Sequence, residues 1–206
     1  MAFFYINCLL SVNIERRAGE DMFKTEKQTE TRAQKLRDLA RMIEDETYKQ
    51  KYMYGVTYIK QFVEEYACEY EKEHGISPVD MVEFRLKTAE SIADKLEKKG
   101  CNISFENALE SLSDLAGVRV VCSSEEHVYA TERFLCRCTE LAIVRKKDYI
   151  SCPKKNGYRS IHLIAEISVP CEEGDDIIRV EIQLRTMAMH CWAELDHRRF
   201  YKKLTK

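Results

Sequence analysis

Two carboxylates occupy positions where they could bind a metal ion and accept a proton. Asp114 directly precedes the apolar stretch "LAGVRVVC", and Glu181 lies in the middle of the alternating stretch "IIRVEIQLR". A carboxylate is costly to bury unless it is paired or bound to a metal. Taken singly, Asp114 could cap a turn and Glu181 could form an ordinary salt bridge. If their strands are neighbours, the two carboxylates would form the kind of oxygen site that Mg²⁺ prefers.

Cationic side chains come from many separate segments of the chain. A single charged run would indicate a solvated surface, whereas cations dispersed over strand ends and alternating faces favour a cleft. Arginine grips phosphate with two hydrogen bonds and lysine acts as a point charge, so such a cleft could receive phosphates. The residues concerned are Arg85, Lys87, Lys95, Arg119, Lys147, Lys154, Arg159, His162 and Arg185.

Composition and missing motifs exclude several classes of protein. A net charge of -2 over 206 residues gives no global field for nucleic acid or membrane binding. Neither GxxxxGK[ST] nor a strand-linked GxGxxG is present, so a P-loop ATPase or a Rossmann domain is not expected. The opening "MAFFYINCLLSV" is too short to span a bilayer. The nine cysteines lack CxxC spacing, which predicts reduced thiols in a cytoplasmic protein.

The elements that must position these residues form an α+β pattern. Apolar periodicity predicts helices at 31–48, 56–74, 105–112, 125–137 and 186–203, and strands at 116–122, 141–147, 160–168 and 177–185. Residues 82–96 fit one long helix, but a strand followed by a helix capped by Thr88 is preferred, because a strand places Arg85 and Lys87 on one face. The sequence therefore predicts a mixed sheet of about five strands flanked by helices.

Two features of the helices add to this pattern. Tyr58, Phe62, Tyr66 and Tyr70 recur at a spacing of four, which is typical of a core or helix-pairing face. Gly75 follows them and is placed to end the helix.

Several linked stretches resemble the synthetase domain of the RelA/SpoT alarmone synthetases. They are "DLAGVRVVC", "KDYISCPKKNGYRSIH", "VEIQLRTMAMHCWAELDHRRFYK" and "FRLKTAESIADKL". The length resembles the small single-domain branch of that family. The resemblance implies a nucleotidyltransferase-like domain at 77–206 after an N-terminal helical segment at 1–76. Residues 1–21 are expected to be disordered or an extension upstream of a start at Met22.

The resemblance also implies an activity. Such enzymes transfer pyrophosphate from ATP to the 3′-hydroxyl of GDP or GTP with Mg²⁺, releasing AMP and making ppGpp or pppGpp in the stringent response. No hydrolase domain precedes the match, so synthesis without degradation is expected, with no membrane and no stable nucleic-acid partner. The small members form homotetramers through C-terminal helices that lie beyond the last residue of this sequence. Whether this chain forms a homo-oligomer is therefore left open. The alternatives are a non-catalytic guanine-nucleotide or RNA-binding module and a synthetase of altered specificity.

Roles implied by the resemblance can be assigned position by position. Asp114 resembles the Mg²⁺ ligand, and Glu181 the carboxylate that activates the 3′-hydroxyl and shares the metal. Arg85 and Arg119 resemble the pair that sandwiches adenine, and Lys87, Ser91 and Lys95 resemble ATP phosphate contacts. The implied acceptor site contains Lys147, Lys154, Asn156, Tyr158, Arg159, His162, Gln183 and Arg185. Within it, Tyr158 resembles the residue that stacks on guanine, presented by a tight turn at Gly157.

Overall fold

The computed structural model describes residues 31–171 and 174–204. The chain is divided at residue 32, and the sheet lies entirely in the unit of residues 33–206, called the second unit below. The predictions for residues 1–21 lie outside the described residues. None of the helices in the described part of the chain is long and apolar enough to cross a membrane.

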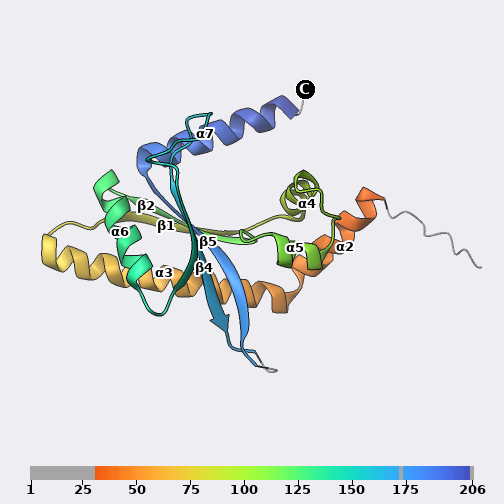
Figure 1. The fold of residues 1–206 in the computed structure, drawn as a ribbon, viewed down its shortest axis with the longest axis horizontal. Coiled ribbons are helices and arrows are strands. Elements are labelled where there is room, and N and C mark those ends of the chain that lie inside the picture. Colours follow the sequence, from red (N-terminus) through yellow and green to blue (C-terminus); the bar gives the residue numbers. More distant parts are fainter. Residues whose placement is uncertain (1–30, 172–173, 205–206) are drawn as a thin grey trace, which may run out of the picture. The chain divides into compact units, whose positions relative to one another are not determined.

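The second unit is built on a five-stranded mixed sheet (Figure 1). Its strands are β1 (Val79–Leu86), β2 (Ala116–Cys122), β3 (Ala142–Asp148), β4 (Ile161–Val169) and β5 (Asp176–Thr186), in the order β1-β2-β5-β4-β3. Strands β2 and β5 are parallel, and the other neighbouring pairs are antiparallel. The predicted α+β fold with about five strands is therefore confirmed.

The helices agree with the sequence pattern except near the start of the described chain. They are α2 (Arg32–Glu44), α3 (Glu46–His74), α4 (Ala89–Lys98), α5 (Phe105–Ser111), α6 (Glu125–Arg137) and α7 (Met187–Leu204). The predicted end of the first helix and the predicted start of the second were wrong. Helix α2 stops at Glu44, and α3 begins at Glu46, ten residues before Val56. The cause is Asp45, whose carboxylate accepts the N–H groups of Thr47 and Tyr48 and so caps α3.

Two residues predicted to mark helix ends are confirmed. Gly75 ends α3 in the left-handed conformation, with a φ of 75°. Thr88 caps α4 by accepting the N–H of Ser91 at 3.3 Å, so a strand followed by a helix is the correct interpretation of residues 82–96. Strand β1 begins three residues earlier than the predicted 82–86.

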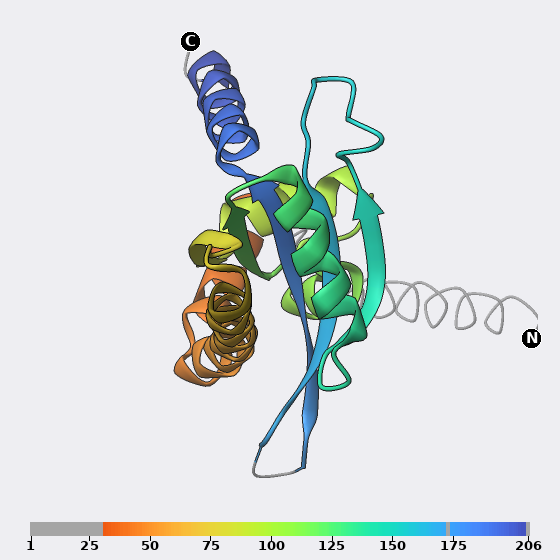
Figure 2. The same ribbon diagram turned by 90° about the vertical axis from the view of Figure 1, so that its left-hand side faces the viewer.

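Helices α3 and α6 cover one face of the sheet, as the two views of the ribbon show (Figures 1 and 2). The β5 side chains that face them, Val180, Ile182 and Leu184, are fully buried. Strand alternation leaves Arg179, Glu181, Gln183 and Arg185 on the opposite face, as predicted. One face of the sheet is thus reserved for the core, and the other is available for polar chemistry.

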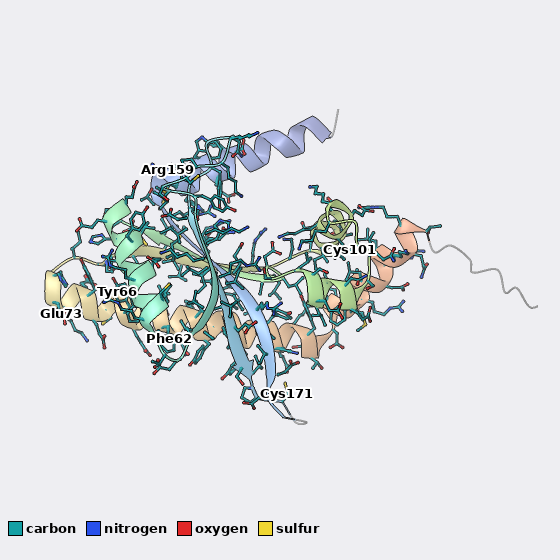
Figure 3. The ribbon with its side chains drawn as sticks, in the orientation of Figure 1. Phe62, Tyr66, Glu73, Cys101, Arg159 and Cys171 are labelled. Atoms are coloured by element: carbon teal, nitrogen blue, oxygen red, sulfur yellow. The ribbon has the colours of Figure 1, made fainter. Side chains whose placement is uncertain are left out.

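The aromatic stripe on α3 pairs that helix with α6. Tyr66 stacks on Phe134 of α6 with ring centroids 4.3 Å apart, and Figure 3 shows Phe62 and Tyr66 beside α6. The line of α3 that is fully buried against the sheet is a neighbouring one, which includes Val56 and Ile59. The helix-pairing interpretation of the stripe is confirmed, while the division of the chain at residue 76 stays a prediction.

Candidate active site

A cleft of about 550 Å³ lies on the face of the sheet opposite α3. Its walls come from strands β1, β3, β4 and β5, from α4, and from the segment between α5 and β2. Nine of the predicted site residues line it: Arg85, Lys95, Asp114, Lys147, Lys154, Tyr158, His162, Glu181 and Gln183. Residues distant in sequence are thereby brought together around one polar space.

Asp114 is held at the entrance to β2 by two lysines. Lys87 and Lys95 each approach its Oδ2 at 2.5 Å, and its side chain is only 10% exposed. Burial acts to raise the pKa of Asp114, but the hydrogen bonds and charges of the two lysines outweigh burial and hold the pKa below its usual value. Asp114 is therefore a carboxylate at neutral pH.

Glu181 lies on the neighbouring parallel strand, in register with Gly117 of β2. Its Oε1 is 3.0 Å from Nδ1 of His162, and its Oε2 accepts the side-chain N–H of Gln183 at 2.6 Å. Burial and the charge of Asp114 act to raise the pKa of Glu181. The contacts with His162 and Gln183 lower it by more, so the net shift of the pKa is downward. Two ionised carboxylates therefore face the same cleft.

This pair of carboxylates fits a magnesium ion. No group of three or more His, Cys, Asp or Glu side chains in the described residues could hold a metal by itself. Magnesium, however, is commonly held by one or two carboxylates, with substrate phosphates and water completing its shell. Oδ1 of Asp114 is buried without a hydrogen-bond partner, which leaves one hard oxygen open to such an ion.

One side of the cleft is formed by the loop between β3 and β4, which carries several of the predicted acceptor-site residues. The ammonium of Lys154 lies 4.5 Å from the ring centroid of Tyr149 and 4.6 Å from that of Tyr158. Both distances are within the range of a cation–π interaction. The two rings meet edge to face, with centroids 6.1 Å apart. An aromatic platform next to a cation is suited to a base and its phosphates.

Gly157 makes this loop turn tightly, with a φ of 84°. A Cβ added at Gly157 would lie 3.4 Å from Trp192 of α7. We expect Gly157→Ala to lower the free energy of unfolding by about 1 kcal/mol, because a side chain is strained in the left-handed region. Chemical denaturation measures this change, and an unchanged midpoint and slope would contradict it.

Asp148 shapes the start of the same loop by accepting the N–H groups of Ile150 and Ser151. Burial acts to raise the pKa of Asp148, but these hydrogen bonds outweigh it and hold the pKa below 3.8. A carboxylate with a lowered pKa adds stability above its unfolded pKa of about 3.9, and that stability is lost as the pH falls through the folded pKa.

Asp148→Asn should therefore lose this contribution. The difference in melting temperature between wild type and variant should be constant between about pH 5 and 7 and shrink below about pH 4. Thermal unfolding across this range tests the expectation. A difference that stays constant down to about pH 2.5 would show that Asp148 does not act through its charge.

The two arginines that are predicted to bind adenine line the same part of the site. Arg85 and Arg119 line a small pocket of about 50 Å³ beside the main cleft. Arg119 also binds two carboxylates, Glu83 at 3.2 Å and Glu194 of α7 at 3.1 Å. Arg119 is thus linked to α7 by an ion pair.

Other predicted residues lie outside the main cleft. Asn156 donates to Asp196 of α7 at 3.0 Å. Arg159 pairs with Glu125 of α6 at 3.0 Å. Ser91 contacts its helix cap Thr88. The predicted roles of Ser91, Asn156 and Arg159 in nucleotide binding stay predictions.

Several cleft residues were missed by the sequence reasoning. They include Lys99, Ser113, Arg145, Tyr149 and Arg179. Arg145 and Arg179 each lie two residues from a predicted site residue on the same strand face, so alternation could have found them. Lys99 and Ser113 lie at helix ends, where local sequence gives no such signal.

Comparison with known proteins identifies the family. A family model described as "Region found in RelA / SpoT proteins" matches residues 84–206. The chain belongs to the RelA/SpoT family. The suspected resemblance is thereby confirmed for more than half of the sequence.

Curated RelA/SpoT relatives include two GTP pyrophosphokinases of Bacillus subtilis. YwaC is 43% identical over 134 residues, which cover 65% of this chain and 64% of the relative. YjbM is 34% identical over 134 residues, which cover 65% of this chain and 61% of the relative. The chain thus matches less than two thirds of the length of either relative.

A solved RelA/SpoT structure extends this similarity to the fold. It is the small alarmone synthetase 1 of Bacillus subtilis bound to its product pppGpp. The two structures have a TM-score of 0.69 and 30% sequence identity, over 77% of this chain and 81% of the other. The predicted small alarmone synthetase fold is therefore confirmed.

Proposed function

We propose that this chain is a GTP or GDP pyrophosphokinase. It transfers the β,γ-pyrophosphate of ATP to the 3′-hydroxyl of GDP or GTP and releases AMP. The observation that carries the proposal is the cleft in which two ionised carboxylates, Asp114 and Glu181, face cations from four separate elements. The names of the relatives support the same activity.

The cations solve the first physical problem of this reaction, which is repulsion between two polyphosphates. Lys87 and Lys95 lie beside Asp114 and would contact the phosphates of ATP, while Arg85 and Arg119 would hold the adenine. Fixing both nucleotides in line converts a bimolecular encounter into a unimolecular step. Mg²⁺ held by Asp114 and Glu181 would supply charge neutralisation and orientation of the phosphates when bound.

Glu181 solves the second problem, the weak nucleophilicity of a sugar hydroxyl. The 3′-oxygen attacks the β-phosphorus of ATP, and the bond from that phosphorus to the oxygen of the α-phosphate breaks. The hydroxyl proton passes to Glu181 as attack proceeds, and AMP leaves. General base catalysis of this kind contributes about 10²–10⁴-fold to rate.

The acceptor nucleotide would occupy the edge formed by the β3–β4 loop. Tyr158 would offer its ring to the guanine, and Lys147 and Lys154 would hold the acceptor phosphates. His162, which was also expected to contact these phosphates, has both ring nitrogens within hydrogen-bond distance of Glu181 and Tyr158, so we assign it to the support of Glu181. Gln183 and Arg185 support this edge from β5. Residues of both nucleotide sites thus come from one chain.

We also propose a cytoplasmic location. All eight cysteines in the described part of the chain are free thiols, which fits a reducing compartment. The proposed substrates ATP and GTP are available there.

Transfer of label tests the proposed activity directly. Purified protein is incubated with Mg²⁺, ATP labelled in its β- or γ-phosphate, and each of GMP, GDP, GTP and ADP, and the products are separated. We expect label in a guanine nucleotide carrying a 3′-pyrophosphate. A labelled 3′-pyrophosphate on an adenine nucleotide alone would indicate altered specificity, and nucleotide binding without transfer would indicate a non-catalytic module. Either outcome would overturn the proposal.

A further inference from the structure

Five side chains at the acceptor edge form a closed ring of hydrogen bonds. Glu181 is joined through Oε1 to Nδ1 of His162, at 3.0 Å, and Nε2 of His162 is 2.7 Å from the hydroxyl of Tyr158. Arg185 donates to that hydroxyl at 3.1 Å and also to the side-chain oxygen of Gln183. Gln183 closes the ring by donating to Oε2 of Glu181 at 2.6 Å.

The chemistry of the groups fixes the direction of the bonds around a neutral His162 ring. The carboxylate of Glu181 can only accept, so Nδ1 of His162 carries the ring hydrogen. The guanidinium of Arg185 can only donate, so the hydroxyl of Tyr158 accepts from it and gives its own hydrogen to Nε2 of His162. Nε2 of His162 then accepts, and its ring hydrogen lies on Nδ1, which donates to Glu181. Two chains of hydrogen bonds therefore run from Arg185 to Glu181. The one through Tyr158 and His162 ends at Oε1, and the one through Gln183 ends at Oε2.

The ring is also anchored in the fold. Arg185 is only 2% exposed, which is unusual for an arginine, and it lies at the end of β5. Tyr158 comes from the β3–β4 loop and His162 from β4, so the ring joins three separate segments. Because hydrogen bonds join Tyr158 to Glu181 through His162, we expect removal of the Tyr158 hydroxyl to alter the position of the Glu181 carboxylate.

We propose that Arg185 and the hydroxyl of Tyr158 are positioning groups that hold His162 in its Nδ1–H tautomer and thereby fix the carboxylate of Glu181. Tyr158, which would stack on the acceptor nucleotide, and Glu181, which would take the proton, are then linked by one hydrogen-bond network. This inference rests on the proposed function. It assigns Tyr158 a role for its hydroxyl that stacking on a base does not need.

Tyr158→Phe separates the two roles, because it keeps the ring and removes only the hydroxyl. We expect kcat to fall about tenfold, as for loss of a partner that orients a ligand, while the KM for GDP stays within about twofold of wild type. Tyr54→Phe is the matched control. It removes the hydroxyl of an exposed tyrosine on α3, the helix that covers the other face of the sheet, and kcat should not change.

A kcat of Tyr158→Phe within about twofold of wild type would overturn the proposal. An increase in KM alone would do the same, because the hydroxyl would then act only in binding. Both results would leave the proposed function intact, since the wild type would still make product.

A second measurement does not depend on activity. Nitrogen-15 NMR of the histidine side chains, without nucleotide, reports which ring nitrogen carries the hydrogen, and His162→Asn assigns the signal. We expect the Nδ1–H tautomer in the wild type and its loss in Tyr158→Phe. An Nε2–H tautomer in the wild type would overturn the positioning role. A wild type that makes no alarmone would overturn the proposed function alone, and the tautomer would still decide the ring.

Discussion

Replacing Glu181 by glutamine should lower kcat by roughly 10³-fold while ATP and GDP still bind. Glutamine has nearly the same shape but cannot take the proton of the 3′-hydroxyl at neutral pH. The ring with His162 and Gln183 loses one charged acceptor, but the wall of the cleft keeps its volume. Initial rates of labelled product and calorimetric titration with GDP measure the two effects separately.

The control for this variant lies on the same strand. Asp176→Asn removes a carboxylate that pairs with Lys51 outside the cleft, and kcat should not change. If Glu181→Gln kept a kcat near that of wild type, Glu181 would not be the proton acceptor. If it lost GDP binding together with activity, its main role would be structural.

Replacing Asp114 by asparagine should lower activity by at least about 10²-fold and raise the Mg²⁺ concentration needed for half-maximal rate. The change removes the negative charge that pairs with Lys87 and Lys95 through Oδ2 and that would bind the metal ion through the unpaired Oδ1. Lys87 and Lys95 would repel both each other and the metal ion. Rates across a series of Mg²⁺ concentrations measure the shift.

Asp80→Asn, at an exposed position on β1, is the control for charge removal on a neighbouring strand. It should have the Mg²⁺ dependence of the wild type. Circular dichroism would show whether Asp114→Asn folds. A folded Asp114→Asn protein with an unchanged Mg²⁺ dependence would exclude Asp114 as the main metal ligand.

Much of the fold could be predicted from the sequence because each element has its own local signal. Period-two alternation gave β5 its two faces, and Gly75 and Thr88 marked helix ends that the structure confirms. The break at Asp45 was missed because apolar periodicity continues across it, although an aspartate before Glu46 is itself a capping signal.

The site was predicted less completely, because its geometry depends on neighbours that are distant in the sequence. Alternation placed Glu181 and His162 on the polar face, and parallel pairing of β2 and β5 brought Asp114 to the same cleft. Local sequence could not show that Arg159 pairs with α6 or that Asn156 pairs with α7. Those contacts arise only when the sheet and helices pack.

Helix α7 contacts one residue from each of the two proposed nucleotide sites. Through Glu194 it holds Arg119 on the donor side, and through Asp196 it holds Asn156 beside the acceptor turn. If the proposed function holds, substitutions of Glu194 and Asp196 would change the affinities for both substrates without altering any group that contacts the reacting atoms. Because both residues belong to one helix, a shift of α7 would change the proposed affinities for ATP and for the acceptor nucleotide together. Selection for tighter ATP binding through α7 would then also alter acceptor binding.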